Sequence, residues 1–166
     1  MTKLIICAIC AICGITTANA QKFGHVNSQE IIQAMPEFTK ARADLEALTK
    51  QYDADLKSMQ EELQKKSEAY EKEQATLPAN IKQRRETELQ EMYQKIQQSY
   101  QDNQQALAKE QNEKMQAITS KVLEAIKAVG QAGGYVYIMD VTSGVPYIST
   151  TLSTDVTAEV KKKLGI

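Results

Sequence analysis

A long stretch without glycine constrains this chain more than any other feature. Residues 25–129 contain no glycine, their only prolines are Pro36 and Pro78, and Glu, Lys, Gln, Leu and Ala dominate them. These unbranched residues favour helix, and one helix of that length would be exceptional in a globular protein. Pro78 falls near the middle, where its ring would break a helix. The sequence therefore predicts two long antiparallel helical arms with a tip near residues 77–80.

The apolar residues of both arms form narrow stripes. They recur every three or four residues, with one slip near residues 52–59, which predicts a coiled-coil seam. Between Gln97 and Glu113 the stripe thins and glutamine becomes frequent, so we expect weak pairing and a bend there. Acid-first pairs four residues apart, such as Glu46 with Lys50, indicate solvated outer faces with no catalytic role.

Residues 1–20 have the layout of a cleaved secretory signal peptide. Lys3 precedes an apolar run over residues 4–13, and Ala18-Asn19-Ala20 resembles a cleavage site. A lipoprotein signal is the alternative, but each cysteine follows isoleucine and not a small residue. Cleavage after Ala20 would remove all three cysteines and one lysine, which changes the net charge from −1 to −2. We therefore expect a soluble, disulfide-free mature protein that binds no nucleic acid and touches membranes at most peripherally.

The two ends of the mature chain, residues 21–35 and 130–166, predict a small β-rich head, and residues 36–129 form the arms. Strands are expected at Lys22–Val26 and Tyr135–Asp140, with a returning strand at Val145–Ile148 after a turn. Pro146 is tolerable only at a strand start or edge. Short helices are expected at 28–34, capped by Asn27, and at 158–164, capped by Thr157.

The strand at residues 135–140 is apolar on both faces, so both should be covered. Three short strands cannot cover themselves in one chain, whereas strands pooled from several copies could close into a barrel. The fold class is thus α+β: a coiled-coil-like hairpin on a small β head that forms an oligomeric barrel, with a short C-terminal helix. The expected interface residues are Phe23, Val26, Tyr135, Val136, Tyr137, Ile138, Tyr147 and Ile148. Burial alone does not choose the number of subunits.

Enzymatic activity finds little support in the sequence. The chain has no glycine-rich phosphate loop, no metal-spaced Cys/His set and no nucleophile motif. Its one histidine, His25, falls in an expected strand, where a half-buried structural role fits better than that of a base or ligand. We expect no enzyme and no cofactor.

The motifs at the two ends resemble those of the Skp/OmpH family of periplasmic chaperones. Phe23-Gly24-His25-Val26-Asn27 leads to Met35-Pro36-Glu37-Phe38, and Asp155-Val156-Thr157 is similar to the family's closing D-[IV]-T. The resemblance implies a homotrimer with a barrel body and three helical tentacles around a cavity. It also implies a periplasmic holdase that works without ATP. Such a protein binds unfolded outer-membrane proteins and delivers them to the outer-membrane assembly machinery.

The residues are compatible with two non-enzymatic functions. A holdase should offer weak, adaptable apolar contacts from the arms, and the candidate client-binding residues are Met59, Leu63, Tyr93, Ile96 and Tyr100. A structural coiled-coil adapter or spacer of the cell envelope is the alternative, with a more regular seam. A prefoldin-like cytosolic chaperone conflicts with the signal peptide. Lys82, Arg84 and Arg85 cluster beside the tip, either as a solvated helix end or as a contact with anionic lipid or clients.

Overall fold

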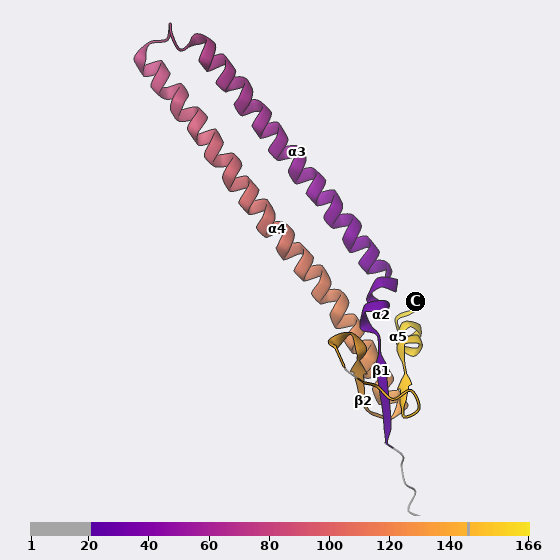
Figure 1. The fold of residues 1–166 in the computed structure, drawn as a ribbon. Helices are drawn as coiled ribbons and strands as arrows, with labels where there is room; N and C mark the ends of the chain where they lie inside the picture. The colour runs from indigo at the N-terminus through magenta and orange to yellow at the C-terminus, as the bar shows by residue number, and fades with distance from the viewer. Residues whose placement is uncertain (1–20, 146) are drawn as a thin grey trace, which may run out of the picture. The chain divides into compact units, whose positions relative to one another are not determined.

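The computed structural model describes residues 21–145 and 147–166, so the expected signal peptide and Pro146 lie outside the described residues. The chain divides into two units. The head unit contains the N-terminal strand through Ser28 together with Ala125–Gly165, and the arm unit contains Gln29–Glu124. Long helices and a small set of strands make up the fold (Figure 1), which confirms the predicted mixture of a helical hairpin and a few strands.

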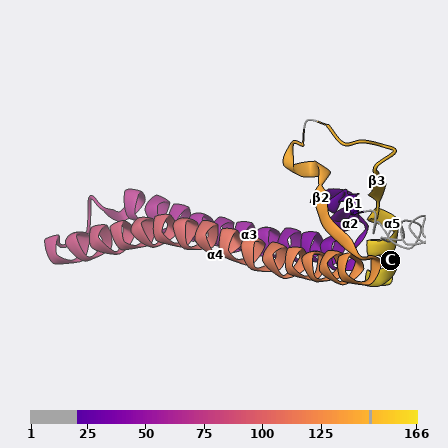
Figure 2. The same cartoon turned by 90° about the horizontal axis from the view of Figure 1, so that it is seen from below.

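The arm unit is built on two long helices that run side by side in opposite directions (Figures 1 and 2). Helix α2 (Ser28–Ala34) precedes α3 (Pro36–Glu73), and α4 (Ala79–Gly133) returns after a turn. Pro36 stands in the first turn of α3, where its missing N–H costs nothing. The turn occupies residues 74–78, so α3 ends at Glu73, a few residues before the expected tip at 77–80.

Helix α4 continues past Val129, where the sequence suggested that it would end. One glycine inside a helix costs only about 1 kcal/mol, so Gly130 does not stop α4. The helix ends at Gly133 because Gly134 adopts φ +66°, a left-handed conformation that suits glycine. A Cβ on Gly133 would clash with the Tyr135 ring, so any other residue here would displace that ring.

Polar contacts join α3 to α4 near both ends of the hairpin. Toward its base, Lys121 Nζ lies 2.9 Å from Glu37 and Lys114 Nζ lies 3.1 Å from Asp44. Ala41, Ile118 and Val122 are buried in the same part. Toward the tip, Lys66 reaches Glu88 and Tyr70 donates to Glu86. Among the described residues, no polar cross-arm contact is seen between these two groups. The seam there depends on half-buried apolar side chains.

The head contains a three-stranded sheet in the order β2-β1-β3. Strand β1 (Lys22–Val26) pairs in parallel with β2 (Tyr135–Asp140) and with β3 (Ser153–Asp155). Helix α5 (Thr157–Leu164) follows. Val26, Ala125, Val156 and Val160 form the buried apolar core of this unit.

The expected returning strand at Val145–Ile148 is wrong. A short 3-10 helix, η1 (Val141–Ser143), follows β2, and the described residues of 145–148 have no regular structure. The third strand pairs in parallel with β1, and a parallel neighbour needs a long connection where an antiparallel one needs only a tight turn. The chain therefore uses residues 141–152 as that connection.

The expected capping of the last helix by Thr157 is also wrong. Thr157 is the first residue of α5, the N-cap is Val156, and the Val156 side chain makes no capping hydrogen bond. The Asp155 carboxylate instead accepts hydrogen bonds from the Thr157 N–H and hydroxyl.

Among the described residues, no helix combines the length and the apolarity needed to cross a membrane.

Candidate functional site

The head sheet leaves apolar side chains uncovered. Val136 and Tyr137 on β2 are 57% and 50% exposed, and Tyr147 in the following connection is 79% exposed. Tyr137 stacks against Phe23 with ring centroids 4.9 Å apart. A cavity of about 220 Å³ lies beside this pair, and Met139 and Leu152 also line it. The apolar residues beside the cavity form a surface, which we call the β2 surface: Phe23, Tyr137, Met139, Tyr147 and Leu152. Val136 is exposed on the same strand but does not line this cavity.

The eight expected interface residues therefore do not share one environment. Val26 is buried in the core of its own chain. The Tyr135 ring covers Gly133, and Ile138 lies against Gly24 and Gly130. Phe23, Tyr137 and Tyr147 belong to the β2 surface, and Ile148 lines its cavity. Val136 is exposed on β2 but does not line that cavity. Met139 and Leu152 complete the surface and were missed, although Met139 could have been found because it alternates with Tyr137 along the strand.

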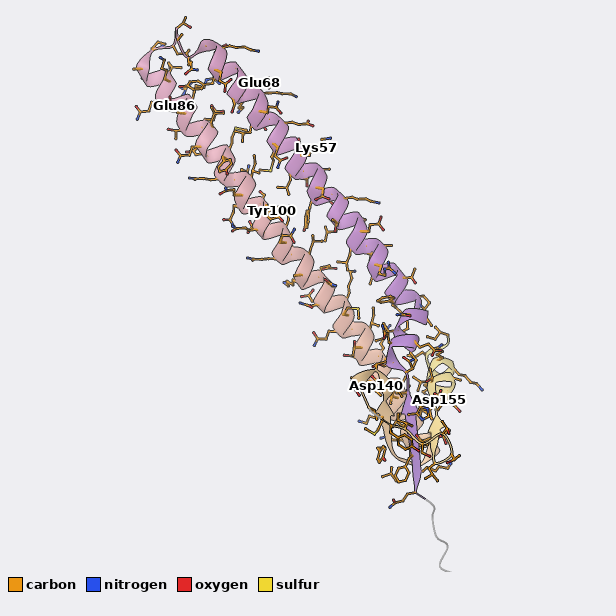
Figure 3. The ribbon with its side chains drawn as sticks, in the orientation of Figure 1. Lys57, Glu68, Glu86, Tyr100, Asp140 and Asp155 are labelled. Atoms are coloured by element: carbon orange, nitrogen blue, oxygen red, sulfur yellow. The ribbon has the colours of Figure 1, made fainter. Side chains whose placement is uncertain are left out.

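Two aspartates connect the ends of the chain within the head (Figure 3). Asp140, at the end of β2, accepts hydrogen bonds from the Ser28 N–H and hydroxyl and from the Thr142 N–H. Asp155 binds Thr157, and the Thr157 hydroxyl accepts the Asn27 N–H at 3.0 Å. The Asn27-Ser28 junction is thus held by both aspartates.

Hydrogen bonding determines the protonation of both carboxyls. Burial opposes the ionisation of Asp140, but hydrogen bonds from Ser28 and Thr142 outweigh it and lower the pKa. Burial likewise opposes ionisation of Asp155, and the bonds from Thr157 lower its pKa. Both groups are therefore ionised at neutral pH. The closing Asp155-Val156-Thr157 motif acts structurally, because Val156 is fully buried and its N–H bonds the His25 carbonyl.

His25 occupies a structural position in the head. Its Nδ1 lies 2.8 Å from the Ser153 hydroxyl, across the β1–β3 pairing. Asp155 pairs with His25 in the strand register, but its Oδ1 accepts the Thr157 hydrogen bonds. Among the described residues, no cluster of His, Cys, Asp and Glu is arranged to hold a metal ion.

The five candidate client-binding residues divide into two groups. Met59, Leu63 and Ile96 are half-buried in the seam between α3 and α4. Tyr93 and Tyr100 are 55% and 56% exposed, and Figure 3 shows Tyr100 on α4. The two tyrosines are seven residues apart, so they share one face of the helix about 10 Å apart along its axis.

The same heptad position on α4 includes residues that bond across to α3. Glu86 lies seven residues before Tyr93, and Lys114 and Lys121 occupy later positions of the repeat. These three side chains contact Tyr70, Asp44 and Glu37. The tyrosines therefore flank the seam in the part of the hairpin between the two groups of polar contacts. They present aromatic surface beside an apolar seam.

The cationic residues near the tip are interleaved with acids. Arg84 is exposed, and Lys82 and Arg85 are half-buried. The Lys66 hydrogen bond, assisted by the charges of Arg85 and Arg84, lowers the pKa of Glu88. A shallow hollow there is lined by Arg84 together with Glu88 and Glu91. The local charge is consequently mixed and not purely basic.

A groove of about 250 Å³ near the base of the hairpin was not predicted from the sequence. Its floor is small and apolar, with Ala41, Ala117 and Ile118, and its rim carries the Lys114 and Lys121 ion pairs. The exposed Leu123 was likewise missed, because its neighbours in sequence are polar or belong to the seam.

Comparison with known proteins gives consistent results. A protein-family model described as "Outer membrane protein (OmpH-like)" matches residues 22–164. The chaperone protein Skp of Yersinia enterocolitica is 27% identical over 148 residues, covering 89% of this chain and 88% of the relative. Skp of Pectobacterium atrosepticum is 27% identical over 145 residues, covering 87% and 86%.

A solved structure supports the same fold. The crystal structure of an OmpH-like outer membrane chaperone from Caulobacter crescentus CB15 is similar with a TM-score of 0.75. The two chains are 17% identical, and the match covers 87% of this chain and 83% of the other. Since the family model spans nearly all of the described residues and the curated relatives are chaperones, this chain belongs to the Skp/OmpH family of chaperones.

Proposed function

We propose that the protein is an ATP-independent periplasmic holdase for unfolded outer-membrane proteins. The observation that carries the proposal is the exposed pair Tyr93 and Tyr100 beside the half-buried seam of Met59, Leu63 and Ile96. Aromatic and thioether side chains bind apolar segments without a fixed geometry. That property suits a protein that holds disordered chains.

The head would organise the arms by joining three copies of the chain. The β2 surface and the exposed Val136 support this part of the proposal, because a monomer would leave Val136, Tyr137 and Tyr147 in water. Strands pooled around a barrel would cover that surface and remove the free edges of β2 and β3. The signal peptide expected at residues 1–20 would direct the chain to the periplasm, where the outer-membrane assembly machinery would receive its clients.

Apolar contact should exceed charge as the source of client affinity. The cations near the tip lie among acids, and exposed charges are screened beyond about 8 Å at physiological ionic strength. Burial of apolar surface contributes roughly 25 cal/mol per Å². A structural spacer is the second candidate, because the cross-arm ion pairs would also suit a stiff coiled coil.

The deciding experiment dilutes a urea-unfolded outer-membrane β-barrel protein into buffer without nucleotide and follows light scattering. The protein in stoichiometric amount should suppress aggregation, and the Tyr93→Ser/Tyr100→Ser variant should suppress it less. The matched control is Gln97→Ser/Gln104→Ser, which alters two exposed positions with the same spacing on α4 but removes no aromatic surface. A protein that never delays aggregation would favour the spacer. Equal activity of the two variants would remove the tyrosines from the client site.

A further inference from the structure

The methionines of the described chain differ sharply in their exposure to solvent. Met35 is 2% exposed, whereas Met59, Met92 and Met115 are half-buried and Met139 is 42% exposed. A thioether that solvent reaches is open to oxidation, and a buried one is protected. Oxidation should therefore spare Met35.

Met59 and Met92 differ from the others because they line one cavity from facing arms. The cavity, of about 150 Å³, is lined by Met59, Glu62 and Lys66 from α3 and by Met92, Lys95 and Ile96 from α4. Two thioethers and one isoleucine supply its apolar lining. Two ammonium groups belong to the same wall.

Lys66 also makes the polar connection between the arms at this level. Its Nζ lies 2.6 Å from Glu88 Oε1 on α4 and 3.4 Å from Glu62 Oε1 on α3. These hydrogen bonds to Glu88 and Glu62 raise the pKa of Lys66, so the ammonium group stays charged. Any new hydrogen-bond acceptor in the cavity would compete with Glu88 for the N–H groups of Lys66.

We propose that Met59 and Met92 form an oxidation site that controls the pairing of the arms at this level. A two-electron oxidant, such as hydrogen peroxide or hypochlorous acid, supplies the oxygen. With peroxide, the sulfur lone pair attacks one oxygen, an S–O bond forms and the O–O bond breaks. The departing oxygen takes up a proton and the sulfoxide loses one, so water is released. Sulfur loses two electrons and peroxide gains them.

The sulfoxide changes both the polarity and the bonding of the cavity. Its oxygen is a strong acceptor that is unfavourable against Ile96 unless a donor reaches it. Lys66 and Lys95 are the ammonium donors in the cavity wall. A hydrogen bond from Lys66 to the sulfoxide draws it away from Glu88, and the cross-arm ion pair weakens. Oxidation thus loosens the pairing of the arms at this cavity and draws water into it.

The test treats the purified protein with a graded series of hydrogen peroxide. Peptide mass spectrometry then locates each added oxygen, and hydrogen exchange measures the protection of amides in residues 88–96. Met59 and Met92 should gain oxygen well before Met35. Exchange in residues 88–96 should become roughly two- to fivefold faster, as expected for the loss of one exposed ion pair. The proposal concerns arm pairing and does not depend on the holdase activity.

Variants separate this site from general oxidative damage. Met59→Leu/Met92→Leu conserves volume and removes the oxidisable sulfur, so peroxide should no longer accelerate exchange there. Met115→Leu is the matched control, since it removes another half-buried methionine of α4 and should leave the response unchanged. Glu88→Gln should show faster exchange before oxidation and little further change after it. If the Met59→Leu/Met92→Leu protein fails to fold, Glu88→Gln still tests whether the peroxide response depends on the cross-arm ion pair.

Three results would overturn the proposal. The first is oxidation of Met35 as fast as that of Met59 and Met92. The second is full oxidation of both sites with unchanged exchange in residues 88–96. The third is an undiminished peroxide response in a folded Met59→Leu/Met92→Leu protein.

Discussion

Replacing Val136 with aspartate tests the assembly of the head most directly. The obvious position from the sequence alone is Ile138, but Ile138 lies against Gly24 and Gly130 of its own chain. A charge there would damage the protomer whether or not it assembles. Val136 is 57% exposed, so its replacement should leave the single chain folded. Its effect should appear only where another subunit covers it.

The size of the effect follows from that exposure. Full burial of a valine side chain contributes about 1.5–3 kcal/mol. Assembly could bury at most the exposed 57% of Val136, so the lost contact is about 0.9–1.7 kcal/mol per subunit. An unpaired carboxylate in an apolar interface adds a further cost of several kcal/mol. A trimer would contain three such aspartates, so these costs add up. The Val136→Asp assembly should therefore dissociate at micromolar concentrations.

Light scattering coupled to size-exclusion chromatography should report a trimer for the wild type and a monomer for Val136→Asp. Circular dichroism should show that the helical arms persist in the variant. Ala158→Asp is the matched control, because it adds the same charge to an exposed position in the first turn of α5, where an acid is tolerated. A Val136→Asp protein that remains trimeric, or a monomeric wild type, would refute the reasoning.

Three further predictions follow from the polar contacts. Asp140→Ala should destabilise the head by about 2 kcal/mol through lost charge-assisted hydrogen bonds, seen as faster hydrogen exchange in β1 and β2 but not in the arms. Because the pKa of Asp140 is lowered from 3.8 in the fold, the wild type should keep this contribution at neutral pH and lose it as the pH falls below about 3.8. If the amides of β1 and β2 were as protected from exchange at pH 3 as at neutral pH, the predicted loss of stability at low pH would be wrong. Lys66→Met should increase exchange near the tip at low salt and differ little from the wild type at high salt, measured on the same peptides. Replacing Lys82, Arg84 and Arg85 with glutamine should leave client affinity nearly unchanged across a salt series; a steep loss would show that the tip is a binding site.

The helical arms could be predicted from the sequence because helix formation is local. Each helical hydrogen bond joins residues four apart, so composition and the narrow apolar stripe carry most of the information. Pro36 begins α3 as expected, and the turn lies within a few residues of Pro78. Strand β2 matches its expected range, Tyr135–Asp140, because aromatic and β-branched residues fill it.

The candidate sites could be predicted only in part. Tyr93 and Ile96 are both apolar members of α4, and the sequence treats them alike. Their exposure differs because α3 covers only part of the surface of α4, and residues three apart still point about 60° away from each other around the helix axis. The carboxylate contacts of Asp140 were not foreseen either, since its partner Ser28 lies more than a hundred residues away in the chain.

The sequence by itself determined the local elements and their apolar faces, whereas the tertiary structure decided which distant segments meet. Strand β3 is only three residues long and polar, Ser153–Asp155, so no periodicity marks it as a strand. It becomes one because β1 offers an unpaired row of N–H and C=O groups on the side away from β2. The exposure of Val136 has the same origin: the backbone of β2 is paired with β1 on one side, and no described segment of the chain covers the Val136 side chain. Pairing between residues far apart in sequence depends on the whole fold, so it cannot be predicted from the local propensity of either segment.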